Sequence, residues 1–247
     1  MIIDSVVNEG VEQQSAARRI LVYQVPGPNL DNFPAHIDTD DRRICVRTVV
    51  QMPRIVVFGN LLSEKECNAL IALARPRLKK SETMDLRTGG NVPNAVRTSA
   101  TCFFELQEFD VCARIERRLA QLLNWPVSHA EGIQVLRYGI GEQYMPHHDF
   151  FDPRQPGTEK LLRLQGQRVA TMLLYLKSPE RGGATTFPYA GLDVAAERGT
   201  GVFFSYDRPH PSTRTLHAGK PVISGEKFVA TKWFLDRAWT QPIGESE

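Results

Sequence analysis

A succession of short apolar segments separated by glycines fills the second half of this sequence, and it constrains the fold more than any other feature. After residue 126 we expect about eight short strands bounded by turn residues. They cover residues 133–138, 144–151, 169–176, 185–187, 192–195, 201–206, 215–217 and 227–235. Strands this short and this closely spaced are typical of a barrel or a double-sheet jelly roll. We therefore predict a mainly β fold with flanking helices, of the α+β class.

The flanking helices are predicted ahead of this β region. Residues 54–58 indicate a buried strand, and Ser63 and Glu66 then have the spacing of a capping box, which starts a helix expected to reach about Leu78. A second amphipathic helix is predicted around residues 111–122. Charged residues lie between its apolar positions, namely Arg114, Glu116, Arg117 and Arg118, and the basic ones are expected to form its solvated face rather than a binding patch.

Length and local composition suggest one domain with an N-terminal extension. A single barrel or double-sheet domain can fill 247 residues. Residues 1–44 contain Pro26, Pro28 and Pro34 and end in a charged run, so we expect them to form an extension or arm. Residues 45–247 are expected to form the domain itself.

The overall charge and the cysteines exclude several classes of protein. A net charge of +2 lacks the basic excess expected of a nucleic-acid-binding surface. No apolar run approaches membrane-spanning length, and the first residues lack a secretory signal, so a cytoplasmic location is expected. The four cysteines show no C-x-x-C spacing, which argues against structural zinc and disulfides. We expect Cys67 and Cys112 to be apolar residues on helix faces.

A candidate metal site lies in the segment Tyr-Met-Pro-His-His-Asp-Phe. His147 and Asp149 are two residues apart, so on an extended strand both side chains leave the same face. His217, in Thr-Leu-His-Ala-Gly, offers a second imidazole. Two histidines and one carboxylate form the facial triad of non-haem Fe(II) oxygenases, which leaves three coordination positions open. His148 must point to the opposite face, and we expect it to have a structural role.

Further motifs surround these three residues in a fixed order. The first group is Tyr138, Gly141, Tyr144, Pro146, His147, Asp149 and Phe150, followed by residues 168–171, 182–185, 187 and 188. The second group is residues 217–219, Pro221, Val222, Gly225, Lys227, Val229, Ala230, Lys232 and Trp233. From about residue 54 to residue 235, the sequence resembles the catalytic domain of the prolyl 4-hydroxylases, which are iron- and 2-oxoglutarate-dependent dioxygenases.

This resemblance implies a fold and a set of site residues. The core would be a double-stranded β-helix, a cupin-like jelly roll, within a catalytic domain of residues 45–247. His147, Asp149 and His217 would be the iron ligands. Lys227 would bind the far carboxylate of 2-oxoglutarate, and Tyr138 would also contact this cosubstrate. Ascorbate would rescue uncoupled turnovers, as it does in the family.

The chemistry of the residues supports the same cofactors. A 2-oxo acid chelates Fe(II) through its keto oxygen and adjacent carboxylate, which leaves one position for O2. Its second carboxylate would be costly to bury without a cation. Lys227 lies on the last predicted strand, beside apolar residues, and is well placed to supply that charge. The protein's part would be to orient the iron and 2-oxoglutarate and to exclude water.

The expected reaction is hydroxylation of a C–H bond, most simply that of proline in a peptide or protein. Arg168, Trp233 and Tyr144 are candidate substrate contacts at the barrel mouth. The animal collagen enzymes of the family carry a secretory signal, a peptide-binding domain and a partner subunit that are not found in this sequence, so collagen is not the expected substrate. Two alternatives remain: the same chemistry on a nucleic-acid base or small molecule, and a cupin-like metal-binding module without oxygenase activity.

The glycine- and proline-rich loop at residues 85–94 is a candidate lid. It contains Gly89, Gly90 and Pro93 and is long for a connection without structure of its own. We expect it to become ordered when a peptide binds.

Overall fold

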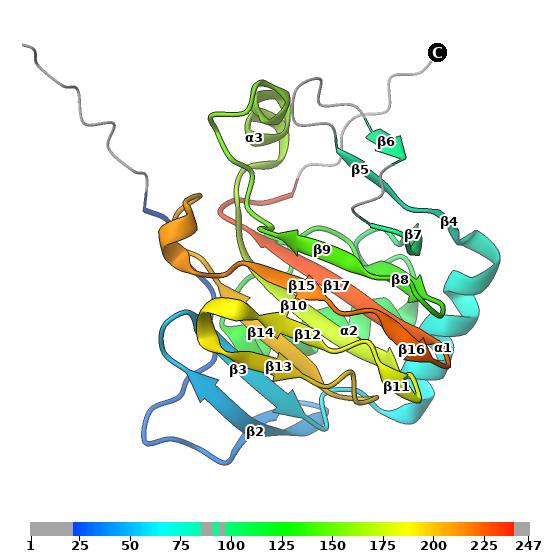
Figure 1. The fold of residues 1–247 in the computed structure, drawn as a ribbon. Coiled ribbons are helices and arrows are strands. Elements are labelled where there is room, and N and C mark those ends of the chain that lie inside the picture. The colour runs from blue at the N-terminus through cyan, green and yellow to red at the C-terminus, as the bar shows by residue number, and fades with distance from the viewer. Residues whose placement is uncertain (1–21, 85–90, 94–96, 240–247) are drawn as a thin grey trace, which may run out of the picture.

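Two main β-sheets, two short strand pairs and three α-helices make up the fold in the computed structural model, which describes residues 22–84, 91–93 and 97–239 (Figure 1). The large sheet has nine strands in the order β1-β2-β3-β14-β10-β17-β8-β7-β4. Their bounds are His36–Thr39, Arg42–Val50, Arg54–Gly59, Gly201–Ser205, Arg168–Lys177, Lys227–Leu235, Gln134–Tyr138, Ala100–Phe103 and Lys79–Lys80. Every pairing within this sheet is antiparallel.

The small sheet has four strands in the order β13-β12-β15-β9 and lies in front of the large one in Figure 1. Its strands are Leu192–Val194, Thr185–Phe187, His217–Gly219 and Tyr144–His147. Two further pairs are β11 (Arg181–Gly182) with β16 (Val222–Ser224), and β5 (Glu82–Met84) with β6 (Asn91–Pro93). The helices are α1 (Glu64–Ala74), α2 (Asp110–Leu123) and α3 (Glu159–Gln165), with short 3-10 turns at Arg75–Arg77, Pro156–Thr158, Pro188–Ala190 and Pro211–Thr213.

Alternation along the strands of the large sheet produces two apolar layers. On β17, Phe228, Ala230 and Phe234 join the cluster beneath α1 and α2. Val229 joins a second cluster that fills the space between the two sheets, and Lys227 and Trp233 line a pocket on that same side. Helices α1 and α2 therefore cover one face of the large sheet, while its other face forms the inside of the jelly roll.

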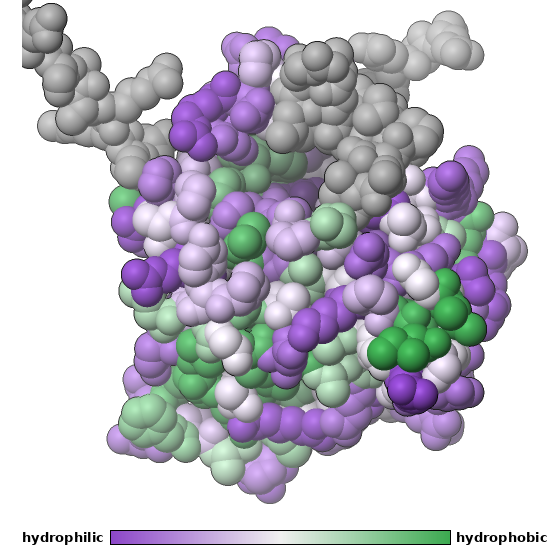
Figure 2. Space-filling view, in the orientation of Figure 1, coloured by the Kyte–Doolittle hydropathy of each residue, from purple (hydrophilic) through white to green (hydrophobic). Residues whose placement is uncertain are grey.

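The exposed face of the small sheet mixes hydrophilic and hydrophobic residues (Figure 2). One hydrophobic patch on this face lies beside β16, where Ile140 forms a bridge with Val222 and both Ile140 and Ile223 are exposed. None of the helices in the described ranges is long and apolar enough to cross a membrane. Cys67 and Cys112 are buried without a disulfide, as expected from the sequence.

The first helix begins as predicted but ends earlier. The Ser63 hydroxyl accepts a hydrogen bond from the Glu66 backbone N–H, and the Glu66 side chain accepts one from the Ser63 backbone, so the capping box is formed. The α-helix stops at Ala74 and not near Leu78, and a 3-10 turn containing Pro76 follows. Proline has no N–H to donate to the preceding turn and its ring crowds the carbonyl there, which ends the regular helix.

The expected domain boundary after residue 44 falls inside β2. The β1–β2 hairpin extends the large sheet, and β2 pairs with β3 from Cys45 to Val50. Ile44 is fully buried in the apolar layer under the helices. Residues 36–44 therefore fold as part of the large sheet.

The prediction that the basic residues of the second helix form its solvated face is wrong for Arg118. Glu116 and Arg118 are buried, whereas Arg114 and Arg117 are exposed. Glu116 accepts a hydrogen bond of 2.5 Å from the buried Lys232 on β17. Helical periodicity locates the apolar face of a helix. It does not show that a charged residue beside that face can be buried when a residue elsewhere in the chain pairs with it.

Arg118 joins three elements of the first half of the chain. Its guanidinium lies 2.6 Å from Asp41 of the β1–β2 turn and 2.6 Å from Glu66 of α1, and it also donates to the Leu61 carbonyl. Arg118 and Glu66 are buried, and Asp41 is about one-third exposed. The network therefore fixes the hairpin and both helices relative to one another.

Replacing Arg118 with methionine is expected to lower the free energy of unfolding by about 3 kcal/mol, measured by urea denaturation. Breaking a buried ion pair from one side typically costs about 3–5 kcal/mol. The lower value applies because Glu66 keeps the Ser63 donors and Arg42 at 3.6 Å. The exposed Arg117→Met variant is the control, with an expected change within about 0.5 kcal/mol. Equal effects of the two substitutions would contradict a special role for Arg118.

Candidate active site

A pocket between the two sheets brings together most of the residues singled out in the sequence. The predicted residues that line it are Tyr138, Tyr144, His147, Asp149, His217, Lys227 and Trp233. The register of β8 and β17 explains this arrangement, since Lys227 lies opposite Tyr138 and Thr231 lies opposite Gln134 on the same inner face. Lys227 is at the start of β17 and Trp233 is six residues along it, so the two mark different depths of the pocket.

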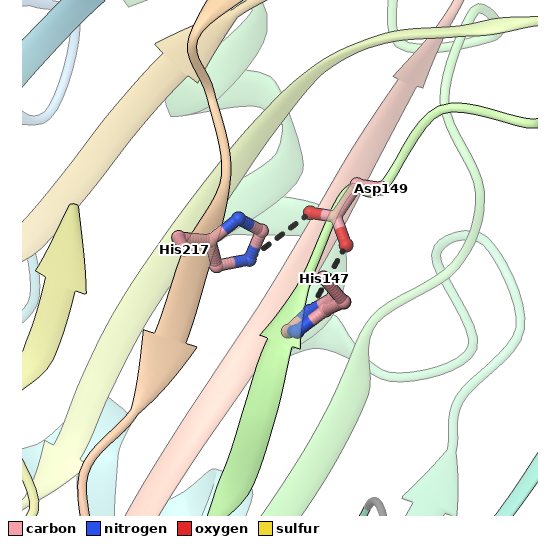
Figure 3. A group of neighbouring side chains, drawn as sticks. All are labelled: His147, Asp149 and His217. Carbon is pink, nitrogen blue, oxygen red and sulfur yellow. Dashed lines mark ion pairs between the residues drawn. The ribbon is translucent and has the colours of Figure 1, made fainter. Parts of the chain in front are cut away.

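His147, Asp149 and His217 converge at one point (Figure 3). His147 ends β9 and His217 begins the neighbouring strand β15, where the two residues are direct partners. The Nε2 atom of His147 lies 3.5 Å from Asp149 Oδ1, and that of His217 lies 3.7 Å from Asp149 Oδ2. One potential ligand atom from each residue lies within 4.8 Å of the others, a spacing that suits a metal ion between them.

Backbone carbonyls fix the orientation of both imidazoles. His147 Nδ1 lies 2.8 Å from the Met145 carbonyl, and His217 Nδ1 lies 3.1 Å from the Thr215 carbonyl. A nitrogen bonded to a carbonyl must carry the proton, so in each neutral ring Nε2 keeps its lone pair. Both Nε2 atoms point toward Asp149. Their lone pairs are free to bind a metal ion, as in metal-binding histidines whose other ring nitrogen donates to a carbonyl.

The protonation states match those of a ligand set. Burial and the neighbouring His147 lower the pKa of His217 to about 4, so this imidazole is neutral at pH 7. Burial alone would raise the pKa of Asp149, but the adjacent His217 and His147 outweigh it and hold that pKa far below its usual range. The Thr171 hydroxyl also donates to Asp149 Oδ2 over 2.7 Å. The centre therefore contains an ionised carboxylate and a neutral His217 imidazole beside the ring of His147.

Lys227 is a buried cation in the same pocket. Its Nζ atom donates to the Gly183 carbonyl over 2.7 Å and lies 5.4 Å from the ring centre of Tyr138 and 5.6 Å from that of Tyr175. Within the described ranges, no carboxylate forms an ion pair with it. Burial lowers the pKa of Lys227 to about 8, so the group remains mostly protonated at pH 7. An ammonium in this position can bind the carboxylate of a ligand and donate hydrogen bonds to it.

The three candidate substrate contacts lie in different surroundings. Tyr144 stacks on His147 with ring centres 3.6 Å apart and lines the pocket. Trp233 also lines the pocket, and its buried indole N–H has no hydrogen-bond partner among the residues that the structure describes. Arg168 does not line the pocket itself. Its guanidinium lies 3.7 Å from the centre of the Trp233 ring and is held by Glu131 at 2.6 Å.

Sequence reasoning did not identify several residues around the centre. Glu131 positions Arg168, and nothing in its local pattern distinguished it from a solvated turn residue. Thr171 was part of the matching motif at residues 168–171 but received no role. Tyr206, whose hydroxyl lies 2.9 Å from that of Thr171, carried no signal beyond its place in a predicted strand.

Two further expectations from the sequence concern His148 and the candidate lid. His148 stacks on Phe150 with ring centres 4.7 Å apart and does not belong to the three-residue group, in agreement with a structural role. The candidate lid at residues 85–94 lies outside the described residues except for Asn91–Pro93, which form β6. Its closure stays a prediction.

Comparison with known proteins identifies the class of this fold and site. Residues 133–235, which include all three converging side chains, match the 2OG-Fe(II) oxygenase superfamily. The chain is similar to a solved structure, the viral collagen prolyl hydroxylase from Paramecium Bursaria Chlorella virus-1 in its 2OG complex. The TM-score is 0.55 at 31% identity, covering 72% of this chain and 94% of the viral one.

Two curated plant relatives narrow the class to a family. Prolyl 4-hydroxylase 1 of Arabidopsis thaliana is 41% identical over 203 residues, covering 75% of this chain and 70% of that protein. Probable prolyl 4-hydroxylase 8 of the same plant is 36% identical, covering 74% and 68%. This chain belongs to the prolyl 4-hydroxylase family of 2OG-Fe(II) oxygenases. Its fold class and its enzyme class, a dioxygenase that uses Fe(II) and 2-oxoglutarate, are as predicted from the sequence.

Proposed function

We propose that this prolyl 4-hydroxylase acts on proline residues in extended segments of a peptide or protein, with His147, Asp149 and His217 as its iron ligands. The observation that carries the proposal is the convergence of these three side chains beside the buried Lys227, which forms no ion pair with any carboxylate of the described residues. Alternative substrates, a nucleic-acid base or a small molecule, would use the same centre. Both the donor set and the lysine fit an oxygenase better than an inert metal-binding module.

The donor set fits Fe(II). Two imidazoles and one carboxylate are the ligands that non-haem Fe(II) oxygenases use, and here the Nε2 atoms of both imidazoles are directed inward. When bound, Fe(II) together with 2-oxoglutarate and O2 supplies the oxidising chemistry that hydroxylates a C–H bond. The protein's own task is to hold these groups in one orientation and to keep water out.

Lys227 fits the far carboxylate of 2-oxoglutarate. Among the described residues its ammonium has one hydrogen-bond partner, the Gly183 carbonyl, so donors remain for a carboxylate. Tyr138 and Tyr175 lie around it and exclude water, which strengthens the charge attraction. In this arrangement Lys227 fixes one end of the cosubstrate, and the metal ligands fix the other.

The proposed peptide contacts are Trp233 and Tyr144, with Arg168 held against Trp233. A proline in polyproline-II conformation exposes its ring and its carbonyl groups. Trp233 offers an aromatic face together with an indole N–H that no described residue accepts from, and Tyr144 lies beside His147. Glu131 neutralises Arg168 and holds it against Trp233, which favours a positioning role for this arginine over a phosphate-binding one.

A nucleic-acid substrate is disfavoured by charge. Phosphate-backbone binding requires several cations along one track, whereas the chain has a net charge of +2 and Arg168 is paired with Glu131. Nucleobase demethylases of similar chemistry generally carry arginine at the position of Lys227. The cytoplasmic location stays a prediction.

The experiment that tests this proposal measures succinate release by the full chain with Fe(II), 2-oxoglutarate and ascorbate. Proline-rich peptides and collagen-like Gly-x-y peptides are compared with methylated oligonucleotides and with no substrate. Stimulation by a proline peptide, absent when each proline is replaced with alanine, is the expected result. Turnover that is stimulated by oligonucleotides and by no peptide would overturn the substrate assignment and leave only the oxygenase chemistry.

The pH dependence of cosubstrate binding is expected to follow Lys227. A lysine is charged below its pKa, so 2-oxoglutarate should bind with full affinity below about pH 8. Above that value, its KM should rise by up to about tenfold per pH unit as the ammonium deprotonates. KM values measured from pH 6.5 to 9.5 test this prediction. Lys227→Arg serves as the comparison, because a guanidinium stays charged throughout this range and the KM of the variant should not change with pH. A wild-type KM that also stays constant from pH 6.5 to 9.5 would contradict the prediction.

A further inference from the structure

Two hydroxyl groups form a chain that ends on the carboxylate of Asp149. Thr171 Oγ1 lies 2.7 Å from Asp149 Oδ2 and 2.9 Å from the Tyr206 hydroxyl. All three residues are buried. The large sheet positions the chain, because Thr171 of β10 lies opposite Phe204 of β14, and Tyr206, two residues further on, faces the same side.

The direction of these hydrogen bonds is determined by the groups involved. An ionised carboxylate can only accept, so the single proton of the Thr171 hydroxyl is donated to Asp149. The bond between the two hydroxyls must then be donated by Tyr206. Tyr206 thereby fixes the rotation of the Thr171 hydroxyl, and Thr171 occupies one oxygen of Asp149.

We propose that Thr171 and Tyr206 are positioning residues that hold Asp149 as a one-oxygen metal ligand. The Thr171 hydroxyl reserves Oδ2, which leaves Oδ1, 3.5 Å from His147 Nε2, as the oxygen available to the ion. The inference rests on the proposed function, in which these three side chains bind Fe(II).

The number of Asp149 oxygens that bind the ion determines how many coordination positions stay open for 2-oxoglutarate and O2. Carboxylates bind metals through one oxygen or two. With two imidazoles and one oxygen, an octahedral ion keeps three open positions, which are as many as a chelating 2-oxo acid and O2 need together. A second oxygen from Asp149 would fill one of them. The hydroxyl chain therefore keeps the third position open.

The barrel contains a similar hydroxyl pair that does not reach the centre. Tyr175 donates to Thr185 Oγ1 over 2.8 Å, and both residues are buried. A second comparison is Thr200, which is also buried and whose hydroxyl donates to the Glu197 carbonyl. Tyr175→Phe and Thr200→Val are therefore matched controls for Tyr206→Phe and Thr171→Val.

The experiment loads the full chain with Mn(II) alone and counts the water molecules on the ion by water-proton relaxation and pulsed EPR in labelled water. Wild-type protein, Thr171→Ser and both controls are expected to keep three waters. Thr171→Val is expected to keep two, because Oδ2 is released to the ion. In Tyr206→Phe, where the threonine hydroxyl can rotate, a value between two and three is expected. Circular dichroism checks folding, and Thr171→Ala replaces the valine variant if that one does not fold.

The outcomes separate this inference from the proposed function. Three waters in the folded valine or alanine variant would overturn the role of Thr171. A wild-type count in Tyr206→Phe would remove Tyr206 from the proposal. His217→Ala is measured alongside: if it binds Mn(II) as tightly as wild type, the three side chains are not the metal site and the proposed function fails with them. If His217→Ala loses Mn(II) and Thr171→Val still holds three waters, only the positioning inference fails.

Discussion

Alanine in place of His217 is expected to reduce proline hydroxylation by more than about 100-fold while the protein stays folded. Substituting a residue that only hydrogen-bonds to a metal ligand typically lowers activity or metal affinity by about 10–100-fold. Removing a ligand itself should lower them further. The variant removes one of the two inward-facing lone pairs and leaves His147 and Asp149 alone at the centre. Succinate release and Fe(II) affinity, measured together, should fall in parallel.

The control for this substitution is His148→Ala. This histidine is next to His147 in the sequence, but it stacks on Phe150 and has no place in the three-residue group. Its loss should change turnover by no more than a few-fold. A His217→Ala protein that retains turnover, with unchanged Fe(II) affinity, would show that another residue completes the metal site.

The second large effect is expected from Lys227→Ala, which should raise the KM for 2-oxoglutarate by about 100-fold or more. Removing one partner of a buried charge pair typically costs about 3–5 kcal/mol, and each 1.4 kcal/mol corresponds to a factor of ten. Fe(II) affinity should change little, because Lys227 binds the Gly183 carbonyl and none of the three metal-site residues.

Lys220→Ala is the matched control for Lys227→Ala. Lys220 lies seven residues earlier, is about half exposed and pairs with Asp193 on the surface. Exposed ion pairs contribute little, so its KM for 2-oxoglutarate should stay close to that of wild type. An unchanged KM in Lys227→Ala would show that this lysine has only a structural role, whatever the fate of the metal site.

Local patterns in the sequence predicted the elements that depend on neighbouring residues. The strand expected at residues 227–235 has those bounds in the structure, because alternating apolar residues face two buried layers. The capping box of α1 also forms, since both of its hydrogen bonds join Ser63 to a residue three positions away. The inner face of β17 followed from the same alternation, and with it the shared side of Lys227 and Trp233.

Strand ends near the site were less predictable. The segment expected at residues 144–151 pairs only as far as His147, and the strand expected at residues 215–217 begins at His217 and reaches Gly219. Both limits are determined by the pairing of His147 with His217, which lie 70 residues apart in the chain. A single sequence carries no local signal for such a register.

The same reasoning explains the missed polar residues. Arg118 is buried because Asp41, 77 residues earlier, and Glu66, 52 residues earlier, supply its partners. Thr171 meets Asp149 and Tyr206, which are 22 and 35 residues away. Local periodicity predicts that a charged residue is exposed to solvent and predicts no specific contact for a threonine in a strand. Only the folded structure shows what these side chains contact.

Mass spectrometry of a turned-over peptide tests the central claim most directly. A proline-containing peptide is incubated with the full chain, Fe(II), 2-oxoglutarate and ascorbate, then sequenced by fragmentation and hydrolysed for amino-acid analysis. The account predicts a gain of about 16 mass units, one inserted oxygen atom, on proline, and the amino acid recovered is 4-hydroxyproline. It also predicts that no gain occurs without either Fe(II) or 2-oxoglutarate. Oxygen inserted at another residue, or full hydroxylation by the His217→Ala protein, would contradict it.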